Sequence, residues 1–471
     1  MKKNVLLFLV IYPVIFLNNV FADSNQTVSP AVNQINRLVD LGMSENCSAE
    51  PVFGGKACVY EINKNAKQTI VFVHGLNAQA ESWISQIDAL KDRYHVISFD
   101  LPGFGKSSRA NKLYSPTNYA KFIHYITTKL VAKPFYLVGH SMGGAISLRY
   151  CAMYPDDVKQ LILSDVGGVL HQYSYAKSIA FKWLKILQDL TFWAIPSLQD
   201  MPGVDEMANV VFQSLEWLPV DIRDALRVPE LRAVILNGNS IPIAGAAVST
   251  ENLSGTIRNN KIPTLIIWGA YDLVTPMRTG KILQVRMPNS YMRVLSRSAH
   301  SPMNDQPTEF NKLVLSHLTA SESELKNRFW KQADFKRSSK IGRCEKGEQK
   351  IFEGNYHRIE LNDCEMALIR NSSIGSIVAR SSNVEIETSQ IVSKDIGIVI
   401  FDSSLEISSS NVSANIGIQT VRSHLDIAGV DFDVETSAVN SLGQSDAVFS
   451  VSTVNGLYLH AYKDFTLEGS L

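Results

Sequence analysis

The sequence predicts an α/β fold in which a mostly parallel sheet lies under a helical cap, followed by an all-β repeat domain. Three observations support this prediction. Strand-like and helix-like segments alternate from Lys56 to about His317, a long insertion interrupts the alternation, and a repeat of about 20 residues fills the end of the chain. The expected parts are a leader (1–22), a catalytic domain (23–335) that contains the cap insertion (168–259), and a repeat domain (336–471).

The alternating part contains six clear strands. Each is a short run of β-branched, aromatic or other apolar residues bounded by turn residues, and several lack the polar alternation of a half-exposed strand. Helical stretches such as 144–153 and 307–318 fall between them, which is the order of a parallel sheet with helical crossovers. The strands are expected at Thr69–Val73, His95–Phe99, Phe135–Val138, Gln160–Ser164, Thr264–Trp268 and Tyr291–Leu295.

A long insertion separates Asp165 from Ile262, where a single helix would suffice. Polar residues recur at helical spacing between Ser178 and Trp193 and leave a wide apolar surface that must cover something. We expect a helical cap over the carboxyl end of the sheet at 168–259. Its large apolar side chains either line a pocket for an acyl or lipid group or simply pack on the core; they are Phe181, Trp183, Phe192, Trp193 and Trp217.

Beyond residue 340 the helical pattern gives way to an internal repeat. Similar stretches begin at Ile374, Ile396 and Ile416, and the tripeptides 405–407 and 425–427 stand at the same offset in the last two. One such coil cannot bury its own apolar face, whereas stacked coils can. The pattern resembles a short right-handed parallel β-helix, and a small antiparallel β-sandwich is the alternative.

The first residues predict export. Lys2 and Lys3 precede an apolar stretch (5–17), and Ala22 stands where a signal peptidase would cleave. An uncleaved membrane anchor is the alternative, but the stretch is short for a span and contains Pro13. We therefore expect a secreted or periplasmic protein.

Export changes the interpretation of the five cysteines. In an oxidising compartment their spacing predicts two local disulfides, Cys47 with Cys58 and Cys344 with Cys364. Cys151 lies in an apolar stretch and would remain a buried free thiol. Five unpaired cysteines are the alternative, which export disfavours.

The strongest motif for chemistry is Gly139-His140-Ser141-Met142-Gly143. It follows an expected strand and opens an expected helix, which is the context that a nucleophile elbow requires. The two glycines allow a sharp turn that projects the serine hydroxyl at the end of the sheet. A chance tight turn is the alternative. We expect Ser141 to be a nucleophile.

A serine hydroxyl needs a base, and the base needs a carboxylate that orients it. His300 lies in a loop after the last expected strand of the catalytic domain, and Asp272 follows the strand before it. Asp165, at the end of the preceding strand, is the rival acid, but it leads straight into the cap. His140 flanks the nucleophile and should point away from it, and His95 is expected to pack within a strand.

Two backbone amides are expected to bind the oxyanion of a tetrahedral intermediate. One belongs to Met142, directly after the nucleophile. The other is assigned to Leu76, in the loop after the strand Thr69–Val73, where Gly75 permits close approach. His74 in this loop is expected to be a structural residue that hydrogen-bonds nearby backbone.

Residues from about Lys56 to Leu318 resemble the α/β-hydrolase fold family, because these motifs stand in the same order as in that family. The resemblance is carried by His74-Gly75 with Trp83, Asp100–Gly105, Gly139–Gly143, Asp272 and His300. It implies the triad and oxyanion assignments given above and implies that 168–259 is the cap. Ala299 departs from the glycine that often precedes the histidine, and alanine is nearly as small. The resemblance does not extend to the repeat.

The expected activity is hydrolysis of carboxylic esters through an acyl-enzyme, by an exported esterase, lipase or lysophospholipase. Serine at the elbow disfavours the dehalogenases and epoxide hydrolases that resemble this family but use aspartate there. Two alternatives remain: other chemistry of this framework, such as carbon–carbon bond hydrolysis or aminopeptidase activity, and a binding or adhesion protein that acts through its β-rich end. Fluorophosphonate labelling of Ser141 separates an enzyme from a binding protein.

The remaining partner expectations follow from charge and motif content. Formal net charge is +0, so no basic surplus points to nucleic acid. No metal-binding motif and no phosphate-cradling loop is evident, so we expect neither metal nor other cofactor. The expected partner is a small-molecule or lipid ester substrate. Contact with a membrane surface or a polysaccharide is a further hypothesis. The sequence does not indicate an oligomeric state.

Overall fold

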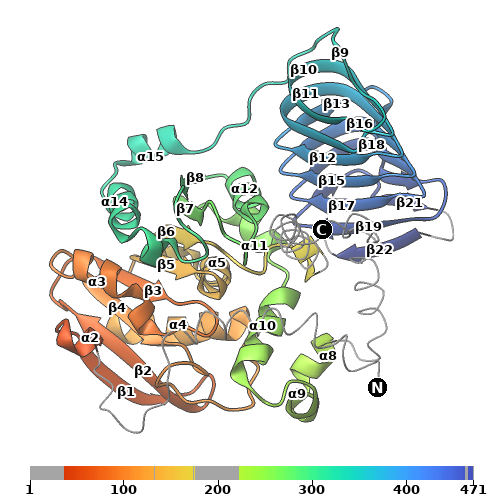
Figure 1. Ribbon diagram of the computed structural model, residues 1–471. Coiled ribbons are helices and arrows are strands. Elements are labelled where there is room, and N and C mark those ends of the chain that lie inside the picture. Colours follow the sequence, from red (N-terminus) through yellow and green to blue (C-terminus); the bar gives the residue numbers. More distant parts are fainter. Residues whose placement is uncertain (1–36, 132, 173, 176–221, 462–464, 470–471) are drawn as a thin grey trace, which may run out of the picture.

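The computed structural model describes residues 37–131, 133–172, 174–175, 222–461 and 465–469. They form two regions, the sheet region (residues 37–328) and the repeat region (residues 341–469), joined by residues 329–340 (Figure 1). The expected leader lies outside the described residues, as does the part of the expected cap at 176–221.

An eight-stranded sheet forms the centre of the sheet region, in the order β1-β2-β4-β3-β5-β6-β7-β8. All neighbours from β4 to β8 pair in parallel, while β1–β2 and β2–β4 are antiparallel. The strands are β1 (Ser44–Glu50), β2 (Gly55–Ile62), β3 (Thr69–Val73), β4 (His95–Asp100), β5 (Phe135–His140), β6 (Val158–Ser164), β7 (Thr264–Gly269) and β8 (Ser290–Leu295).

Helices follow most of these strands and cover the sheet. Strands β3 to β7 are buried almost throughout, which explains why their sequences are continuously apolar. The helices are α2 (Arg37–Asp40), α3 (Ile84–Leu90), α4 (Pro116–Leu130), α5 (Met142–Met153), α8 (Ile222–Arg227), α9 (Pro229–Ile235), α10 (Ser240–Thr250), α11 (Ser254–Asn259), α12 (Met277–Arg286), α13 (Pro302–Asp305), α14 (Pro307–Leu318) and α15 (Glu322–Arg328), with 3-10 turns at Ala80–Trp83 and Pro155–Asp157.

The described part of the expected cap is helical. It consists of α8, α9, α10 and α11. Among the described residues no single helix has the length and apolar character needed to cross a membrane, although α9 and α10 pass that test as a pair bent by 111°.

Strands of the repeat region pair in parallel, one coil above the next. On one face β12, β15, β17, β19 and β22 follow each other, so that Ile386, Ile407, Ile427 and Phe449 form a buried column. The first strands are β9 (Ile341–Cys344), β10 (Gln349–Asn362), β11 (Met366–Arg380), β12 (Asn383–Glu387), β13 (Gln390–Val392), β14 (Ile396–Phe401) and β15 (Ser404–Ser408). Later ones are β16 (Asn411–Val421), β17 (His424–Ala428), β18 (Asp431–Ser441), β19 (Ser445–Ser450), β20 (Thr453–Asn455), β21 (Leu459–Ala461) and β22 (Phe465–Gly469).

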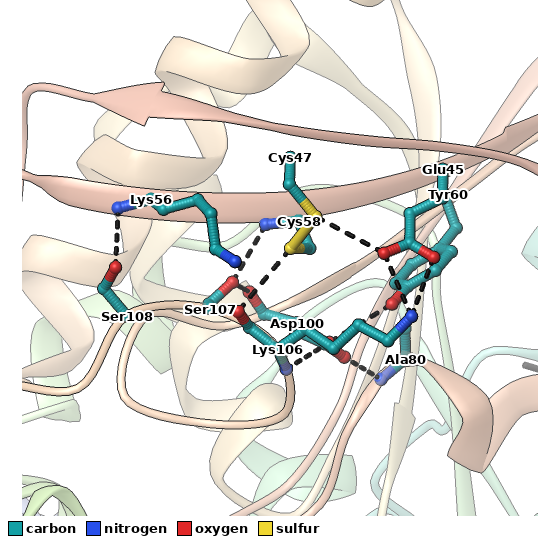
Figure 2. The surroundings of a disulfide bond; sticks show 10 residues. All are labelled: Glu45, Cys47, Lys56, Cys58, Tyr60, Ala80, Asp100, Lys106, Ser107 and Ser108. Carbon is teal, nitrogen blue, oxygen red and sulfur yellow. Dashed lines mark hydrogen bonds and ion pairs between the residues drawn. A yellow bond between two sulfur atoms is a disulfide. The ribbon is translucent and has the colours of Figure 1, made fainter. Parts of the chain in front are cut away.

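The structure contains both expected disulfides. Cys47–Cys58 joins directly paired residues of β1 and β2, beside the buried carboxylate of Asp100 (Figure 2). Cys344–Cys364 joins the first coils of the repeat region. Cys151 is a buried free thiol, as expected.

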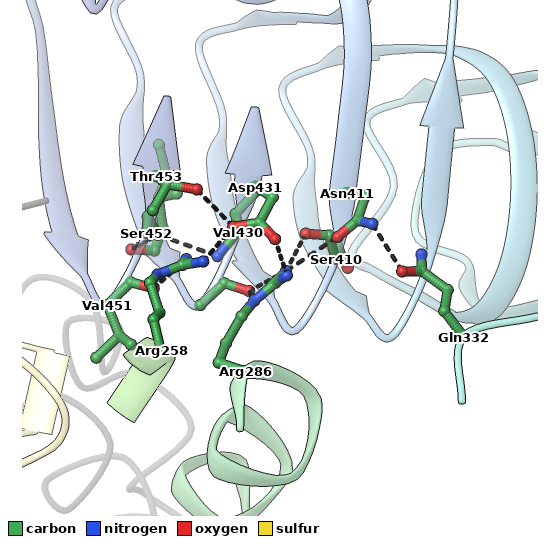
Figure 3. A network of polar contacts seen from close by, with 12 residues as sticks. Arg258, Arg286, Gln332, Ser410, Asn411, Val430, Asp431, Val451, Ser452 and Thr453 are labelled. Atoms are coloured by element: carbon green, nitrogen blue, oxygen red, sulfur yellow. Dashed lines mark hydrogen bonds and ion pairs between the residues drawn. The ribbon is translucent and has the colours of Figure 1, made fainter. Parts of the chain in front are cut away.

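The two regions dock through α11 and α12 (Figure 1). Arg286 of α12 donates to the carbonyl oxygens of Gly429 (2.8 Å) and Ser410 (2.6 Å), and both Arg286 and Arg258 pair with Asp431 (Figure 3). Ala428 and Val451 of the repeat region join the hydrophobic core of the sheet region. The repeat region is thus packed against the sheet region and is not a separate appendage.

Candidate active site

Ser141 stands at the sharp turn between β5 and α5. Its backbone has φ 51° and ψ −119°, a strained conformation for a residue with a side chain. A Cβ at Gly139 would lie 2.4 Å from the carbonyl oxygen of Gly143, and a Cβ at Gly143 would lie 2.3 Å from that of Val73. Both glycines are therefore required for the turn to pack against the sheet. This is the geometry that the motif predicts.

His300 lies against Ser141, although 159 positions separate them in the chain. Its Nε2 is 3.0 Å from the Ser141 Oγ, and its Nδ1 is 2.9 Å from Oδ2 of Asp272. A proton on Nδ1 is donated to the carboxylate, which leaves Nε2 free to accept the hydroxyl proton. The structure thus brings together the serine, histidine and aspartate that the sequence singled out.

Asp272 is held by the loop that follows β7. Its Oδ1 accepts the amides of Val274 (2.7 Å) and Thr275 (2.9 Å), and its Oδ2 accepts the Thr275 hydroxyl (2.5 Å). Burial alone raises the pKa of this carboxyl, but the hydrogen bond and charge of His300 and the Thr275 donors outweigh it and lower the pKa to about 2. Asp272 is therefore an ionised carboxylate, fixed in place, that faces the imidazole. Thr275 could not be recognised from the sequence, since a threonine in a turn carries no distinctive signal.

The residues expected to supply the two oxyanion donors lie near Ser141. Met142 begins α5, and a Cβ at Gly75, next to Leu76, would lie 3.1 Å from the Ser141 Cβ. Within the described part of the chain, neither the Met142 amide nor the Leu76 amide donates to another residue. Both amides are thus available to an oxygen held in front of Ser141.

His74 has the structural contacts expected of it. Its Nδ1 donates to the carbonyl oxygen of Gly75 (2.8 Å), and its Nε2 accepts the amide of Leu101 (3.0 Å). Burial lowers the pKa of this imidazole, with the Gly75 hydrogen bond and the Asp100 charge opposing. The ring therefore links the Leu76 loop to the segment after β4.

His140 points away from the Ser141 hydroxyl and contacts the His300 backbone instead. Its Nε2 is 2.6 Å from the carbonyl oxygen of His300, to which it donates. Burial, then the neighbouring His300, lowers the pKa of His140 to about 3, so the ring is neutral. It holds the loop that carries His300, a role that sequence reasoning missed because it depends on a contact across 160 positions.

Asp165, the rival acid, does not contact the His300 ring by a hydrogen bond. It lies at the end of β6, fully buried, behind Asp272. Its Oδ1 accepts the Gly269 amide (2.9 Å), and its Oδ2 accepts the Ser164 hydroxyl (2.8 Å). The preference for Asp272 as the partner of His300 agrees with this arrangement.

The described part of the expected cap lies against the loop that carries Leu76. A Cβ at Gly245 of α10 would be 3.5 Å from the Leu76 side chain, and a Cβ at Gly168 would be 2.7 Å from Val248 of α10. Small residues at these positions let the helix approach the site closely. The aromatic residues expected to line a pocket at 181–217 lie outside the described residues.

Fold and site together define an α/β hydrolase. The chain matches the family model for the alpha/beta hydrolase fold over residues 68–307, and it belongs to this family. The expected α/β-hydrolase fold with its mostly parallel sheet is confirmed.

Curated relatives match about half of this chain. The monoacylglycerol lipase ABHD6 of Mus musculus is 28% identical over 267 residues, which cover 54% of this chain and 76% of that protein. The uncharacterized protein Rv2715 of Mycobacterium tuberculosis is 27% identical over 271 residues, with the same coverage of 54% and 76%. Among solved structures, an esterase from Exiguobacterium antarcticum aligns with a TM-score of 0.42 and 22% identity, covering 57% of this chain and 97% of that one.

Proposed function

We propose that this protein is an exported serine hydrolase that cleaves carboxylic esters, with lipid-like monoesters as its substrates. The observation that carries the proposal is the unbroken hydrogen-bonded chain from Ser141 Oγ through His300 to Asp272. Relatives named as monoacylglycerol lipases support the ester class. The apolar composition of the expected cap supports a fatty acyl or alkyl group.

The reaction follows from the positions of these groups. Ser141 Oγ attacks the ester carbonyl while His300 Nε2 takes its proton, and the amides of Leu76 and Met142 stabilise the oxyanion. His300 then gives the proton to the departing alcohol, which leaves an acyl group on Ser141. A water molecule, deprotonated by His300, releases the acid and restores the serine. Asp272 remains ionised throughout and stabilises the imidazolium.

A labelling experiment and a substrate series test this proposal. The full chain should react with a fluorophosphonate at Ser141 and hydrolyse monoacylglycerols, lysophospholipids and p-nitrophenyl esters of increasing acyl length. A preference for medium or long chains would support the lipid-like substrate. Failure to cleave any ester, with turnover of carbon–carbon or peptide substrates, would overturn the ester assignment. The absence of any label on Ser141 would instead favour a binding protein.

Export and membrane contact belong to the same proposal. Two disulfides in the described chain support an oxidising compartment. We propose cleavage after Ala22 and release to the periplasm or medium, where the enzyme meets lipid at a membrane surface. Protein sequencing of the N-terminus from each cell fraction tests this, and an intact residue 1 in a cytosolic fraction would contradict it.

We further infer that the repeat region is a short parallel β-helix. Parallel pairing with offsets of 20 to 22 residues, as in Leu405 with Leu425 and Leu425 with Ala447, supports it. The alternative sandwich would require antiparallel neighbours, and the described pairs of β9 to β22 are parallel. An experimental structure with antiparallel strands here would contradict the inference. Polysaccharide contact by its exposed faces remains a hypothesis that a glycan-binding assay with the full chain would test.

A further inference from the structure

The buried carboxyl of Asp165 is unusual in its position. Asp165 follows directly after β6, its backbone lies in the left-handed region (φ 45°), and the whole residue is 0% exposed. Its backbone also adjoins the site, because its carbonyl oxygen lies 3.2 Å from the hydroxyl oxygen of Thr275, which donates to Asp272. A carboxyl in so dry a place is ionised only where a cation or several hydrogen-bond donors stabilise its charge, and otherwise it keeps its proton.

No cation contacts Asp165 among the described residues. Its two oxygens accept from the Gly269 amide and the Ser164 hydroxyl, which are neutral groups. Its other neighbour is the carboxyl of Asp272, one oxygen of which lies within 4.8 Å of an oxygen of Asp165. Two carboxylates this close in a dry place would repel each other, whereas one proton makes the pair a donor and an acceptor.

The remaining question is which aspartate holds the proton. Asp272 has the imidazole Nδ1 of His300 at 2.9 Å and three further donors from Val274 and Thr275, all of which favour its charged form. Burial, then the charge of Asp272, raises the pKa of Asp165 well above its usual range, and its bonds to Gly269 and Ser164 do not offset this. The proton therefore belongs on Asp165.

We propose that Asp165 is a positioning residue whose carboxylic acid donates a hydrogen bond to Asp272 and so holds the carboxylate that orients His300. One O or N atom of each of Asp165, Asp272 and His300 lies within 4.8 Å of the others. The pair carries a single negative charge, enough to stabilise one imidazolium. This inference rests on the proposed function, since it assigns Asp165 a part in the same site.

Other titratable groups also face this pair. His140 lies beside the His300 ring, at 4.9 Å between centroids, and is neutral. Burial, then the charge of Asp272, raises the pKa of the half-buried Tyr175 to about 12, so it too is neutral at ordinary pH. A change in the charge of Asp165 would therefore be felt mainly by His300.

Asp165→Asn tests the protonation state directly. Asparagine matches the shape and donor of a protonated carboxyl and tolerates the left-handed backbone. If Asp165 is neutral, the variant keeps the charge of the site, and the imidazole titration of His300, followed by NMR and assigned with His300→Gln, stays where it is in the wild type. If Asp165 is ionised, losing a negative charge about 5 Å away would lower that midpoint by about one unit or more, which would overturn the proposal.

The titration does not depend on turnover. If the wild-type protein hydrolyses no ester and takes no label, the proposed function fails, while the NMR result still decides the state of Asp165. Asp157→Asn is the matched control, because Asp157 is a buried aspartate at the opposite end of β6 and should leave the His300 titration unchanged.

Asp165→Gly tests the positioning role. Glycine also tolerates this backbone but removes the donor, so Asp272 is no longer held from behind. We expect kcat to fall by about tenfold or more with KM little changed, while Asp165→Asn stays within about threefold of the wild type. Equal loss in both variants, or no loss in either, would contradict the role. Thermal melting of each variant identifies any that fails to fold, and the Asp165→Asn titration then decides alone.

Discussion

Serine hydroxyls serve two different purposes in the two regions of this protein. In the sheet region the Ser141 hydroxyl faces an imidazole nitrogen at 3.0 Å. In the repeat region the Ser403 hydroxyl donates to the carbonyl oxygen of Phe401 (2.6 Å) and accepts the amide of Ser382 (2.9 Å) from the coil before. Ser423 repeats this pattern one coil further on. The same side chain lies beside an imidazole in one region, where we propose that it is a nucleophile, and links backbone groups of neighbouring coils in the other.

The architecture explains this difference. Both regions are built on parallel strands, but helical crossovers in the sheet region bring the ends of β5, β7 and β8 to one edge, where unlike side chains meet. Short turns in the repeat region return each coil to the same position, so like side chains stack on like. The proposed chemistry needs a hydroxyl, an imidazole and a carboxylate together, whereas a regular stack mostly places similar side chains side by side.

The largest expected effect comes from substituting these two serines in turn. Ser141→Ala should abolish fluorophosphonate labelling and lower kcat for esters by about 10⁴-fold or more, because no nucleophile remains. Ser403→Ala should leave kcat unchanged and cost about 1 kcal/mol of unfolding free energy, for one lost link between coils. A comparable loss of activity in both variants would mean that the regions do not divide chemistry and structure in this way.

The contact between the regions gives the next largest effect. Arg278 of α12 is 6% exposed, and its guanidinium forms two hydrogen bonds with the carboxylate of Asp426, which is 2% exposed. Arg278→Met would remove the cation that pairs with the buried Asp426 carboxylate and lower the unfolding free energy by about 3–5 kcal/mol in a urea titration.

Two variants control this experiment. Arg278→Met combined with Asp426→Leu removes both charges and should regain most of the lost stability. Arg422→Met breaks an ion pair with Asp402 on the exposed face of the repeat region and should leave the urea midpoint unchanged. If the Arg278 and Arg422 variants behaved alike, the docking contact would be no stronger than a surface pair.

Removing the Cys344–Cys364 disulfide tests whether the stability of the first coils of the repeat region can change without a change in activity. Cys344 and Cys364 close a loop with a sequence separation of 20. Replacing both with alanine should cost about 3 kcal/mol of unfolding free energy, mainly through the entropy of the unfolded chain. Ester hydrolysis below the melting temperature should not change. Loss of activity in the folded variant would show that the two regions are coupled more closely than their contacts imply.

Much of the sheet region could be predicted because its signals are local. Continuous apolar runs marked β3 to β7 within a few residues, and the glycines around Ser141 marked the elbow. The hairpin of β1 and β2 was missed, since Ser44–Glu50 is largely polar and exposed. Strand β1 is stabilised by its pairing with β2 and by the Cys47–Cys58 disulfide. Neither contact can be recognised from the strand propensity of the sequence.

What could not be predicted depends on contacts between distant residues. The sequence offered Asp165 and Asp272 as rivals for one role, and the structure places them side by side with different contacts. Docking of α12 on the repeat region pairs Arg278 with Asp426, 148 positions away. The sequence around either residue gives no sign of its partner. Motifs identify the reacting groups, whereas the groups that hold them are found only in three dimensions.

The smallest expected effect concerns an acidic column beneath α12. Glu385 of β12 pairs with Glu406 of β15, which pairs with Asp426 of β17. Burial, then the charges of Glu406 and Glu387, raises the pKa of Glu385 to about 7, although nearby Arg278 and Lys281 oppose the shift. A glutamate in the unfolded chain titrates near 4.3.

The sign of the pH effect follows from this difference. Between about pH 4.5 and 7 the folded protein keeps the Glu385 proton and the unfolded chain releases it, so stability falls as pH rises. Glu385→Gln removes the cost of ionisation and should be more stable than the wild type at pH 8 by about 1–2 kcal/mol, with no difference near pH 4.

Urea midpoints at both pH values measure this, with the exposed Glu345→Gln as control. An equal gain at both pH values would mean that Glu385 is ionised normally. A gain at pH 8 alone would show that the repeat region responds to pH through its docking face, independently of His300, the proposed catalytic base.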